Sequence, residues 1–372
     1  MTAIRSTKNV RPKAGRGWSR RAVLQAAAAG AGLAAAPAFI RHAGASTPRK
    51  IKFTLPWIPS GQHAYAFAAK KYWAEKGLDV QVDRGFGSGE AAKAIGLERY
   101  EFGEASYSVM VNSISQGLDL MAIGCKVQVT PAAIFSLKGS GITKPRDLEG
   151  KTVITSSGSA EYILFPAFAK AAGIDASKVK FLLVAPNVRH PMLLEKKADA
   201  LIGYMVSDGA ALLGQGIDLE IVRYADSGVR MLDLGLITQG KRVREEPQLV
   251  ADLVEGAMKG MKMMLLEPRQ CIDLTLQSLK EYQGAAAGPS IIEHSLEIAN
   301  GLGIVPAVEK NGIGFMDPEA WGHTVDLVNR YMPGPKAVEA TGIYTNKFVG
   351  IEKLTPQEWA TVKARVRKYL RT

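Results

Sequence analysis

The sequence predicts an α/β fold of two lobes with a helical C-terminal region. Short apolar strands alternate with helices up to about residue 223, and the alternation restarts once, near residue 151. From Glu246 onward the pattern is almost wholly helical. Strands that alternate with helices of about 10–15 residues indicate parallel sheets covered on both faces. We therefore expect one such sheet in each lobe.

The N-terminal 45 residues have the pattern of an export signal. Arg20 and Arg21 precede an Ala-rich apolar run, 22–40, and the small residues Ala43-Gly44-Ala45 follow it. A charged segment, an apolar segment and a small-residue cleavage site make a signal peptide, and paired arginines are typical of the twin-arginine route. The run is weakly hydrophobic, which disfavours a membrane anchor. We expect a signal peptide over 1–45 and a mature chain in the periplasm.

The next segments predict the elements of both lobes. In the first lobe we expect strands at 51–55, 78–82, 101–103 and 120–124, and helices at 62–76, 89–97 and 107–116. In the second lobe we expect strands at 132–137, 151–155, 179–184, 200–203 and 219–223, and helices at 160–172, 189–195 and 206–213. The C-terminal helices are expected at 246–266, 268–282, 289–302, 317–331 and 356–370.

The order of these elements predicts the domain boundaries. The extended pieces near 132–137 and 231–238 are expected to be the two crossings between the lobes. Residues 46–131 then form the first part of lobe 1 and residues 132–235 form lobe 2. Residues 236–372 return to lobe 1 and add the C-terminal helices.

The charge distribution argues against a nucleic-acid partner. The chain has a formal net charge of +12, but residues 1–45 carry basic side chains and no acid. The rest of the chain, residues 46–372, carries nearly equal numbers of basic and acidic side chains. Cys125 and Cys271 lie far apart in the sequence, and their pairing is left open. Because there is no C-x-x-C pair and the histidines are scattered, we expect no metal and no cofactor.

Several short motifs, in order, resemble one known family. They are Trp57-Ile58-Pro59 with His63, Lys76-Gly77-Leu78-Asp79-Val80, Phe102-Gly103, the pair of segments 138–142 and 147–151, and Leu194-Glu195-Lys196-Lys197-Ala198-Asp199-Ala200. Over about residues 50–270 the chain is similar to periplasmic substrate-binding proteins for thiamine-pyrimidine precursors, alkanesulfonates, taurine and nitrate. This family is also related in fold to thiamine pyrimidine synthase.

The resemblance implies a two-lobe type 2 periplasmic binding protein fold. It also implies a monomer that binds a small-molecule solute between its lobes and delivers it to an ABC permease and its ATPase at the inner membrane. The enzyme in the family needs a lysine, a histidine four residues later and a cysteine-rich run. This chain has Glu104, Ser108 and the sequence of 233–238 at those places, so we expect no catalytic residues and no enzyme activity.

The turns after the strands supply the candidate ligand-binding residues, because ligands of open α/β sheets bind outside the carboxyl ends of strands. For each of them core packing, capping or surface exposure is the competing interpretation. Trp57 is expected to stack on a flat solute, and Tyr204 to close the cleft from the other lobe. The remaining candidates are His63, Glu104, Ser106, Ser156, Ser159, Asn187 and Asp208.

The charges near these turns bear on the class of solute. The turns carry Glu104, with Asp208 nearby, and no Arg or Lys, which favours a flat, amino-bearing solute such as a thiamine pyrimidine precursor. Arg189 opens a helix in lobe 2 and would favour a sulfonate, taurine or nitrate if it pointed inward. Which of Glu104, Asp208, Asp226 and Arg189 faces the cleft stays open at this stage.

Overall fold

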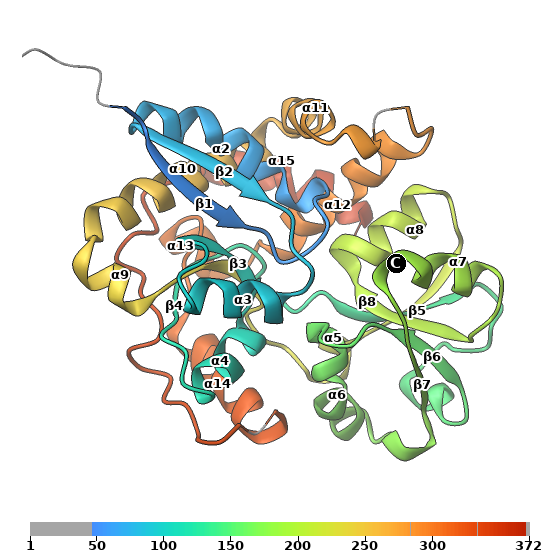
Figure 1. Cartoon of the computed structure of the whole chain (residues 1–372). Helices are drawn as coiled ribbons and strands as arrows, with labels where there is room; N and C mark the ends of the chain where they lie inside the picture. Colours follow the sequence, from blue (N-terminus) through green and yellow to red (C-terminus); the bar gives the residue numbers. More distant parts are fainter. Residues whose placement is uncertain (1–46, 283, 333, 370–372) are drawn as a thin grey trace, which may run out of the picture. The chain divides into compact units, whose positions relative to one another are not determined.

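The computed structural model describes residues 47–369, except residues 283 and 333 (Figure 1). The predicted signal peptide, residues 1–45, lies outside the described residues, so its role in export stays a prediction. Within residues 47–369, the helices are all too short or too polar to cross a membrane.

The first sheet has five strands in the order β2-β1-β3-β10-β4. They are β1 (Arg49–Thr54), β2 (Leu78–Asp83), β3 (Phe102–Ser106), β4 (Met121–Cys125) and β10 (Leu234–Thr238). The turns between them lead into η1 (Gly61–His63), α2 (Ala64–Glu75), α3 (Ser88–Gly96) and α4 (Tyr107–Ser115). Gly77, with φ at 73°, lets the chain reverse directly from α2 into β2.

The second sheet also has five strands, in the order β7-β6-β8-β5-β9. They are β5 (Ala132–Leu137), β6 (Thr152–Thr155), β7 (Lys180–Leu183), β8 (Ala200–Tyr204) and β9 (Leu219–Arg223). Its helices are α5 (Ala160–Ile163), α6 (Phe165–Ala172), α7 (Arg189–Leu194) and α8 (Ala210–Gly214), with the π-helical turn η5 (Met205–Gly209) before α8. Short 3-10 turns are η2 (Pro145–Leu148), η3 (Ala176–Lys178), η4 (Pro186–Val188) and η6 (Tyr224–Ser227).

The expectation of purely parallel sheets is wrong for one strand in each sheet. β10 runs antiparallel to β3 and β4, and β5 runs antiparallel to β8 and β9. These are the strands by which the chain enters the second sheet and returns to the first. A parallel neighbour needs a long crossover, usually a helix, whereas a strand arriving from the other sheet does not have that constraint.

The two crossings lie before the segments expected for them. Residues 132–137 are the full strand β5, and Leu234–Thr238 is the full strand β10. The connecting segments are therefore 126–131 and 224–233. The domain boundaries themselves stay a prediction.

The C-terminal region is helical, as the sequence indicates. Its helices are α9 (Gly240–Glu245), α10 (Pro247–Leu266), α11 (Pro268–Ser278), α12 (Gly288–Leu302), α13 (Pro306–Asn311), α14 (Pro318–Tyr331) and α15 (Pro356–Val366), with η7 (Lys280–Tyr282) and η8 (Arg367–Tyr369). The sequence pattern predicts neither α9 nor α13. It also merged α5 and α6, which divide at Phe165-Pro166 because Pro cannot donate a helical hydrogen bond.

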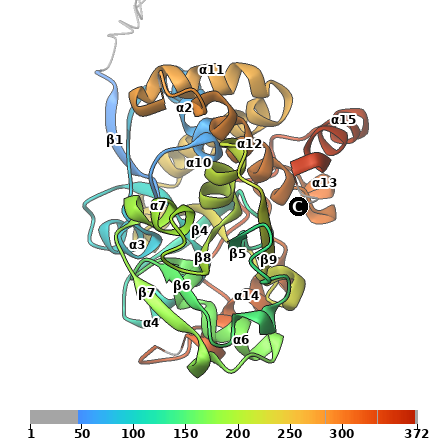
Figure 2. The same ribbon diagram turned by 90° about the vertical axis from the view of Figure 1, so that its right-hand side faces the viewer.

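Two of these helices position the turns that carry the site. α10 packs along α2, where Trp73 Nε1 donates to the main-chain oxygen of Leu253 at 2.8 Å. α12 contacts both η1 and α8, and Figure 1 shows it next to α8, while Figures 1 and 2 both show α10 next to α2. α12 therefore touches η1, which follows β1 of the first sheet, and α8, which follows β8 of the second sheet.

Candidate functional site

A pocket lies where the turns after the two sheets face one another. Its empty space is about 390 Å³ when open solvent is included, but the cavity volume itself is about 30 Å³, well below the roughly 300–1,000 Å³ of small-molecule sites. The first sheet's turns supply Pro56, Trp57, Gln62, Gly87 and Ser88, and the second sheet's supply Ser159, Ala160, Glu161, Arg189, Tyr204, Ser207 and Asp208, with Leu234 from β10.

Four of the nine residues predicted for ligand binding line this pocket: Trp57, Ser159, Tyr204 and Asp208. Trp57 follows β1 and is partly exposed. The Cζ atom of Arg189 lies 5.3 Å from the centre of its ring, so the indole is already in contact with a cation. The indole is thus part of the pocket wall, where a flat solute could stack on it.

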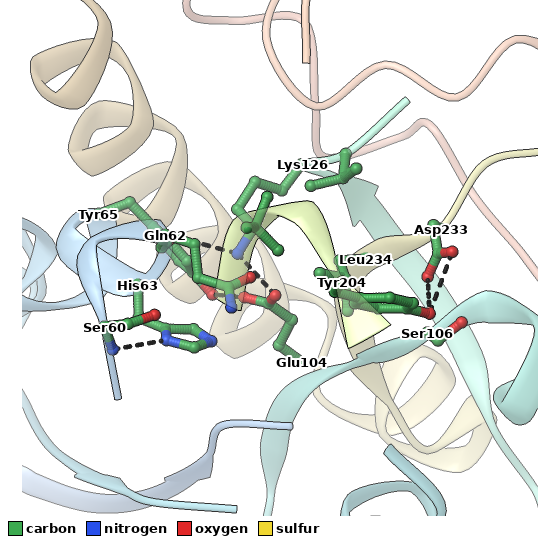
Figure 3. Close-up of polar contacts among 12 residues, drawn as sticks. Ser60, Gln62, His63, Tyr65, Glu104, Ser106, Lys126, Tyr204, Asp233 and Leu234 are labelled. Carbon is green, nitrogen blue, oxygen red and sulfur yellow. Dashed lines mark hydrogen bonds and ion pairs between the residues drawn. The ribbon is translucent and has the colours of Figure 1, made fainter. Parts of the chain in front are cut away.

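The other five lie outside the pocket lining, and the first of them is His63. Its ring is fully buried, and Nδ1 accepts a hydrogen bond from the main-chain nitrogen of Ser60 at 3.2 Å (Figure 3). Nε2 has no partner among the described residues. Burial, followed by the nearby charge of Lys126, holds the pKa of His63 well below its usual value, so the ring is neutral at pH 7.

Glu104 is committed to an ion pair that the sequence did not indicate. Oε1 lies 2.6 Å from Nζ of Lys126, and Oε2 accepts a hydrogen bond from the hydroxyl of Tyr65 at 2.7 Å (Figure 3). Lys126 also donates to the main-chain oxygen of Gln62 at 3.0 Å. Both side chains are buried, and burial lowers the pKa of Lys126 despite the charge of Glu104. Glu104 is therefore neutralised inside lobe 1.

Ser106, Ser156 and Asn187 also lie away from the pocket lining. The Ser106 hydroxyl is buried at 2.9 Å from that of Ser108. Ser156 is buried, and its hydroxyl has no partner among the described residues. Asn187 lies in η4 with its side chain exposed.

Arg189, which the sequence left open, lines the pocket and is 1% exposed. Its Nη2 lies 2.6 Å from Oδ1 of Asp208, and its Nη1 lies 3.3 Å from Oε1 of Glu161. Asp226 is instead exposed and bonds Arg223 at 2.9 Å. Of the charged residues left open, Arg189 and Asp208 face the cleft, and they face it as a pair.

Glu161 and Gln62 are pocket residues that sequence reasoning missed. Glu161 is the second residue of α5, after the N-cap Ser159, and Gln62 is the middle residue of η1. Gln62 lies between the candidates Trp57 and His63, and Glu161 lies two residues after the candidate Ser159. The position of Glu161 in the first turn of a helix could have marked it as a candidate. An acid there ordinarily stabilises the helix dipole, so this position alone is weak evidence for ligand binding.

The two carboxylates of the pocket are in different electrostatic states. Burial raises the pKa of Asp208, but the charge of Arg189 and the hydrogen bond from His190 outweigh it and set that pKa at about 2. Burial raises the pKa of Glu161 to about 7, because Arg189 offsets only part of it and Asp208 adds to it. Asp208 is therefore always ionised near neutral pH, whereas Glu161 titrates there.

Tyr204 links the pocket to the crossings between the sheets. Its hydroxyl lies 3.0 and 3.2 Å from the two carboxylate oxygens of Asp233 (Figure 3). Asp233 belongs to the second crossing, and the hydroxyl of Thr130, in the first crossing, donates to it at 2.6 Å. Burial raises the pKa of Asp233 to about 6 against these hydrogen bonds.

The described residues contain no group of three or more His, Cys, Asp or Glu side chains placed to hold a metal ion. Cys125 and Cys271 are buried and unpaired. Burial raises the pKa of both thiols, that of Cys271 to about 12. Neither is a thiolate at neutral pH.

Comparisons with known proteins place the chain in a family. A family model described as "NMT1/THI5 like" matches residues 60–271, more than half of the chain. The riboflavin-binding protein RibY of Chloroflexus aurantiacus is 24% identical over 312 residues, which are 82% of this chain and 87% of that protein. The formylaminopyrimidine-binding protein of Halalkalibacterium halodurans is 22% identical over 76% of this chain and 85% of its own length.

A relative named as an enzyme is more distant. The 4-amino-5-hydroxymethyl-2-methylpyrimidine phosphate synthase of Legionella pneumophila is 20% identical over 63% of this chain and 75% of its own length. Among solved structures, the alkanesulfonate-binding protein SsuA from Xanthomonas axonopodis bound to MOPS is similar, with a TM-score of 0.62 and 15% identity over 81% of this chain and 99% of that chain. This likeness confirms the predicted periplasmic binding protein fold.

Proposed function

The chain belongs to the NMT1/THI5-like family, and from that premise we propose that it is the extracytoplasmic solute receptor of an ABC importer. It binds a small solute in the pocket between its lobes and delivers it to a permease with its ATPase at the inner membrane. It works as a monomer in the periplasm, after export by the twin-arginine route. The observation that carries the proposal is the pocket itself, which combines an aromatic wall, Trp57, with polar groups from both lobes.

We propose further that the solute is a flat nitrogen heterocycle, with a thiamine pyrimidine precursor as the best candidate. Trp57 offers a stacking face, and two of the more similar relatives are named as binding proteins for such rings. The charges support the same class. Glu161 and Asp208 oppose the single guanidinium of Arg189, so the charged groups that line the pocket sum to −1 when Glu161 is ionised.

Glu104 does not contribute to this charge balance. The carboxylate of Glu104 was expected to face the solute, but Lys126 neutralises it outside the pocket lining. The carboxylates that face a solute in the pocket are those of Glu161 and Asp208.

A sulfonate, taurine or nitrate receptor is the second candidate, and Arg189 is the observation that favours it. Its Nε is buried and has no partner among the described residues. An anion held there would have to displace or tolerate two carboxylates, which disfavours it.

A synthase-like enzyme is a weaker third candidate. Glu104 and Ser108 stand where that enzyme needs a lysine and a histidine. Lys126 lies beside Glu104 in space, but it is held in the buried ion pair.

A thermal-shift screen of the purified protein tests the proposed function. The panel holds pyrimidines, flavins, sulfonates and nitrate. A solute present at about 100 times its dissociation constant adds about 2.7 kcal/mol to the free energy of unfolding. We expect stabilisation by one or more flat heterocycles. Stabilisation by sulfonates alone would support the second candidate, and no stabilisation by any compound would contradict a receptor for these solutes.

A further inference from the structure

Glu161 is held less firmly than the other carboxylate of the pocket. The Asp208 carboxylate is bonded by Arg189 at 2.6 Å, by His190 at 2.8 Å, by the main-chain nitrogen of Tyr204 at 3.3 Å and by the hydroxyl of Ser207 at 3.4 Å. Glu161 lies 3.3 Å from Arg189 through one oxygen, and hydrogen bonds from its own main-chain N–H and from the Ser159 hydroxyl also lower its pKa. Glu161 lines the pocket and is 6% exposed, so a solute in the pocket lies next to a carboxylate that can accept further hydrogen bonds.

Arg189 pairs with Glu161 through Nη1 and also lines the pocket. Asp208 fixes the guanidinium from one side, and the main-chain oxygen of Ile202 accepts from Nη1 at 3.4 Å. Its Nε remains buried without a partner among the described residues. An unpaired buried donor loses its solvation without compensation, so an acceptor group of a solute that reached Nε would remove that cost.

Gln62, which comes from the first sheet's side of the pocket, also has a buried polar atom without a hydrogen-bond partner in the described part of the chain. Its Oε1 is buried and has no partner among the described residues. The side chain comes from η1, whereas Glu161 and Arg189 come from α5 and α7 of the other sheet. A solute that reached both walls would hold the lobes together.

Resting on the proposed function, we propose that Glu161 and Arg189 act as one recognition pair. They select a solute whose ring edge carries an N–H donor next to a hydrogen-bond acceptor, as in an aminopyrimidine or a cyclic imide. The carboxylate accepts from the N–H and the guanidinium donates to the neighbouring ring nitrogen or carbonyl oxygen. A sulfonate has acceptors alone and would leave Glu161 facing oxygen atoms.

The pair also makes binding depend on pH. Burial raises the pKa of Glu161 to about 7, and the titratable and charged groups around it are Arg189 and His190 on α7, Asp208 on η5, Tyr204 on β8 and Tyr224 on η6. A carboxylate is a stronger acceptor than a carboxylic acid. Affinity for an N–H donor edge therefore falls as the pH decreases below about 7.

Calorimetric titrations with 4-amino-2-methylpyrimidine, uracil and ethanesulfonate test the pair. The proteins are the wild type, Glu161→Gln and, as a matched control, Glu195→Gln, which makes the same change at a side chain exposed to solvent beside Lys197. We expect a heterocycle to bind the wild type and the control equally, and to bind Glu161→Gln about tenfold or more weakly. The wild-type affinity for uracil, which keeps its proton in this range, should rise between about pH 5.5 and pH 8.

Each contrary result points to one of the two proposals. Equal heterocycle binding by the wild type and Glu161→Gln, without pH dependence, overturns the recognition pair and leaves the receptor intact. Preferential binding of ethanesulfonate, improved in Glu161→Gln, overturns the solute class. Absence of binding by all three probes to the wild type counts against the proposed function itself. If Glu161→Gln fails to fold by circular dichroism, the pH series on the wild type decides.

Discussion

At the scale of single residues, the pocket residue Trp57 is predicted to stack on a flat solute. Trp57→Ala should weaken heterocycle binding by about 0.5–1.5 kcal/mol beyond the area lost, or roughly 2- to 13-fold, because the stacking face is removed. Trp57→Phe keeps a smaller face and should lose less. Calorimetry measures affinity, and thermal unfolding checks the fold. If Trp57→Ala unfolds while its folded fraction binds normally, Trp57 is a core residue.

Glu104 and Lys126 lead to a prediction about stability. Both are buried, and removal of one partner leaves the other charge uncompensated, which typically costs about 3–5 kcal/mol. We expect that loss in the free energy of unfolding for Glu104→Ala, measured in urea. The double variant Glu104→Gln, Lys126→Met removes both charges and should recover much of it. A single variant as stable as the wild type would show that the pair is not buried in solution.

The candidate site was predictable where one strand and its following turn decide the outcome. Trp57, Ser159, Tyr204 and Asp208 come from such turns, and all line the pocket. Glu104 was misplaced because its partner, Lys126, follows β4, which is separated from β3 by β10 in the sheet. The strand between them, β10, comes more than 100 residues later in the sequence than Lys126, so no local pattern predicts an ion pair across it.

At the scale of elements, the contact between η1 and α12 determines where Gln62 lies. A Cβ atom at Gly61 would overlap the main-chain oxygen of Ile292 on α12, which has little room to move. Gly61→Ala should therefore lower the free energy of unfolding by about 1–3 kcal/mol and weaken solute binding. Gly322→Ala on α14 is the control, because a Cβ atom there meets nothing within 4 Å and alanine favours a helix. Equal stabilities of the two variants would contradict this packing.

The elements themselves were largely predictable, and the exceptions share a cause. Periodicity located most strands and helices within a few residues, including β5 and the long C-terminal helices. It could not predict the antiparallel direction of β5 and β10, since a strand's neighbours depend on the path of the whole chain. Strand direction follows from the crossings between sheets, which carry no periodic signal.

At the scale of the whole molecule, export is predicted to require Arg20 and Arg21. Replacement of both by Lys should leave uncleaved precursor in the cytoplasm, because the twin-arginine receptor recognises that pair. Fractionation and immunoblotting of the two compartments measure it. Arg5→Lys, upstream of the pair, is the control and should be exported normally. Normal cleavage of the double variant would contradict export by the twin-arginine route.

The two crossings meet at Asp233, and this makes the stability of the whole molecule depend on pH. Thr130 in the first crossing and Tyr204 at the end of β8 both bond its carboxyl group, and the main-chain oxygen of Asp233 accepts from the nitrogen of Tyr107 at 2.9 Å. Burial raises its pKa in the folded state to about 6, above the unfolded value of about 3.9. Between these values the folded state holds more protons than the unfolded state.

The protein's free energy of unfolding must therefore decrease as the pH rises from about 4 to 6. The carboxyl group of Asp233 alone contributes a decrease of up to about 1.4 kcal/mol per pH unit. Glu161 contributes in the same direction up to about pH 7, whereas Asp208, with a pKa of about 2, changes stability only below about pH 4. Asp233→Asn removes the first contribution, so its urea-unfolding free energy should vary less between pH 4 and pH 6 than that of the wild type. Asp226→Asn, at an exposed side chain, should keep the wild-type slope. Parallel curves for the wild type and Asp233→Asn would mean that the crossings do not bury a titrating carboxyl group. They would contradict the hydrogen bonds by which Asp233 joins Tyr204 to the first crossing.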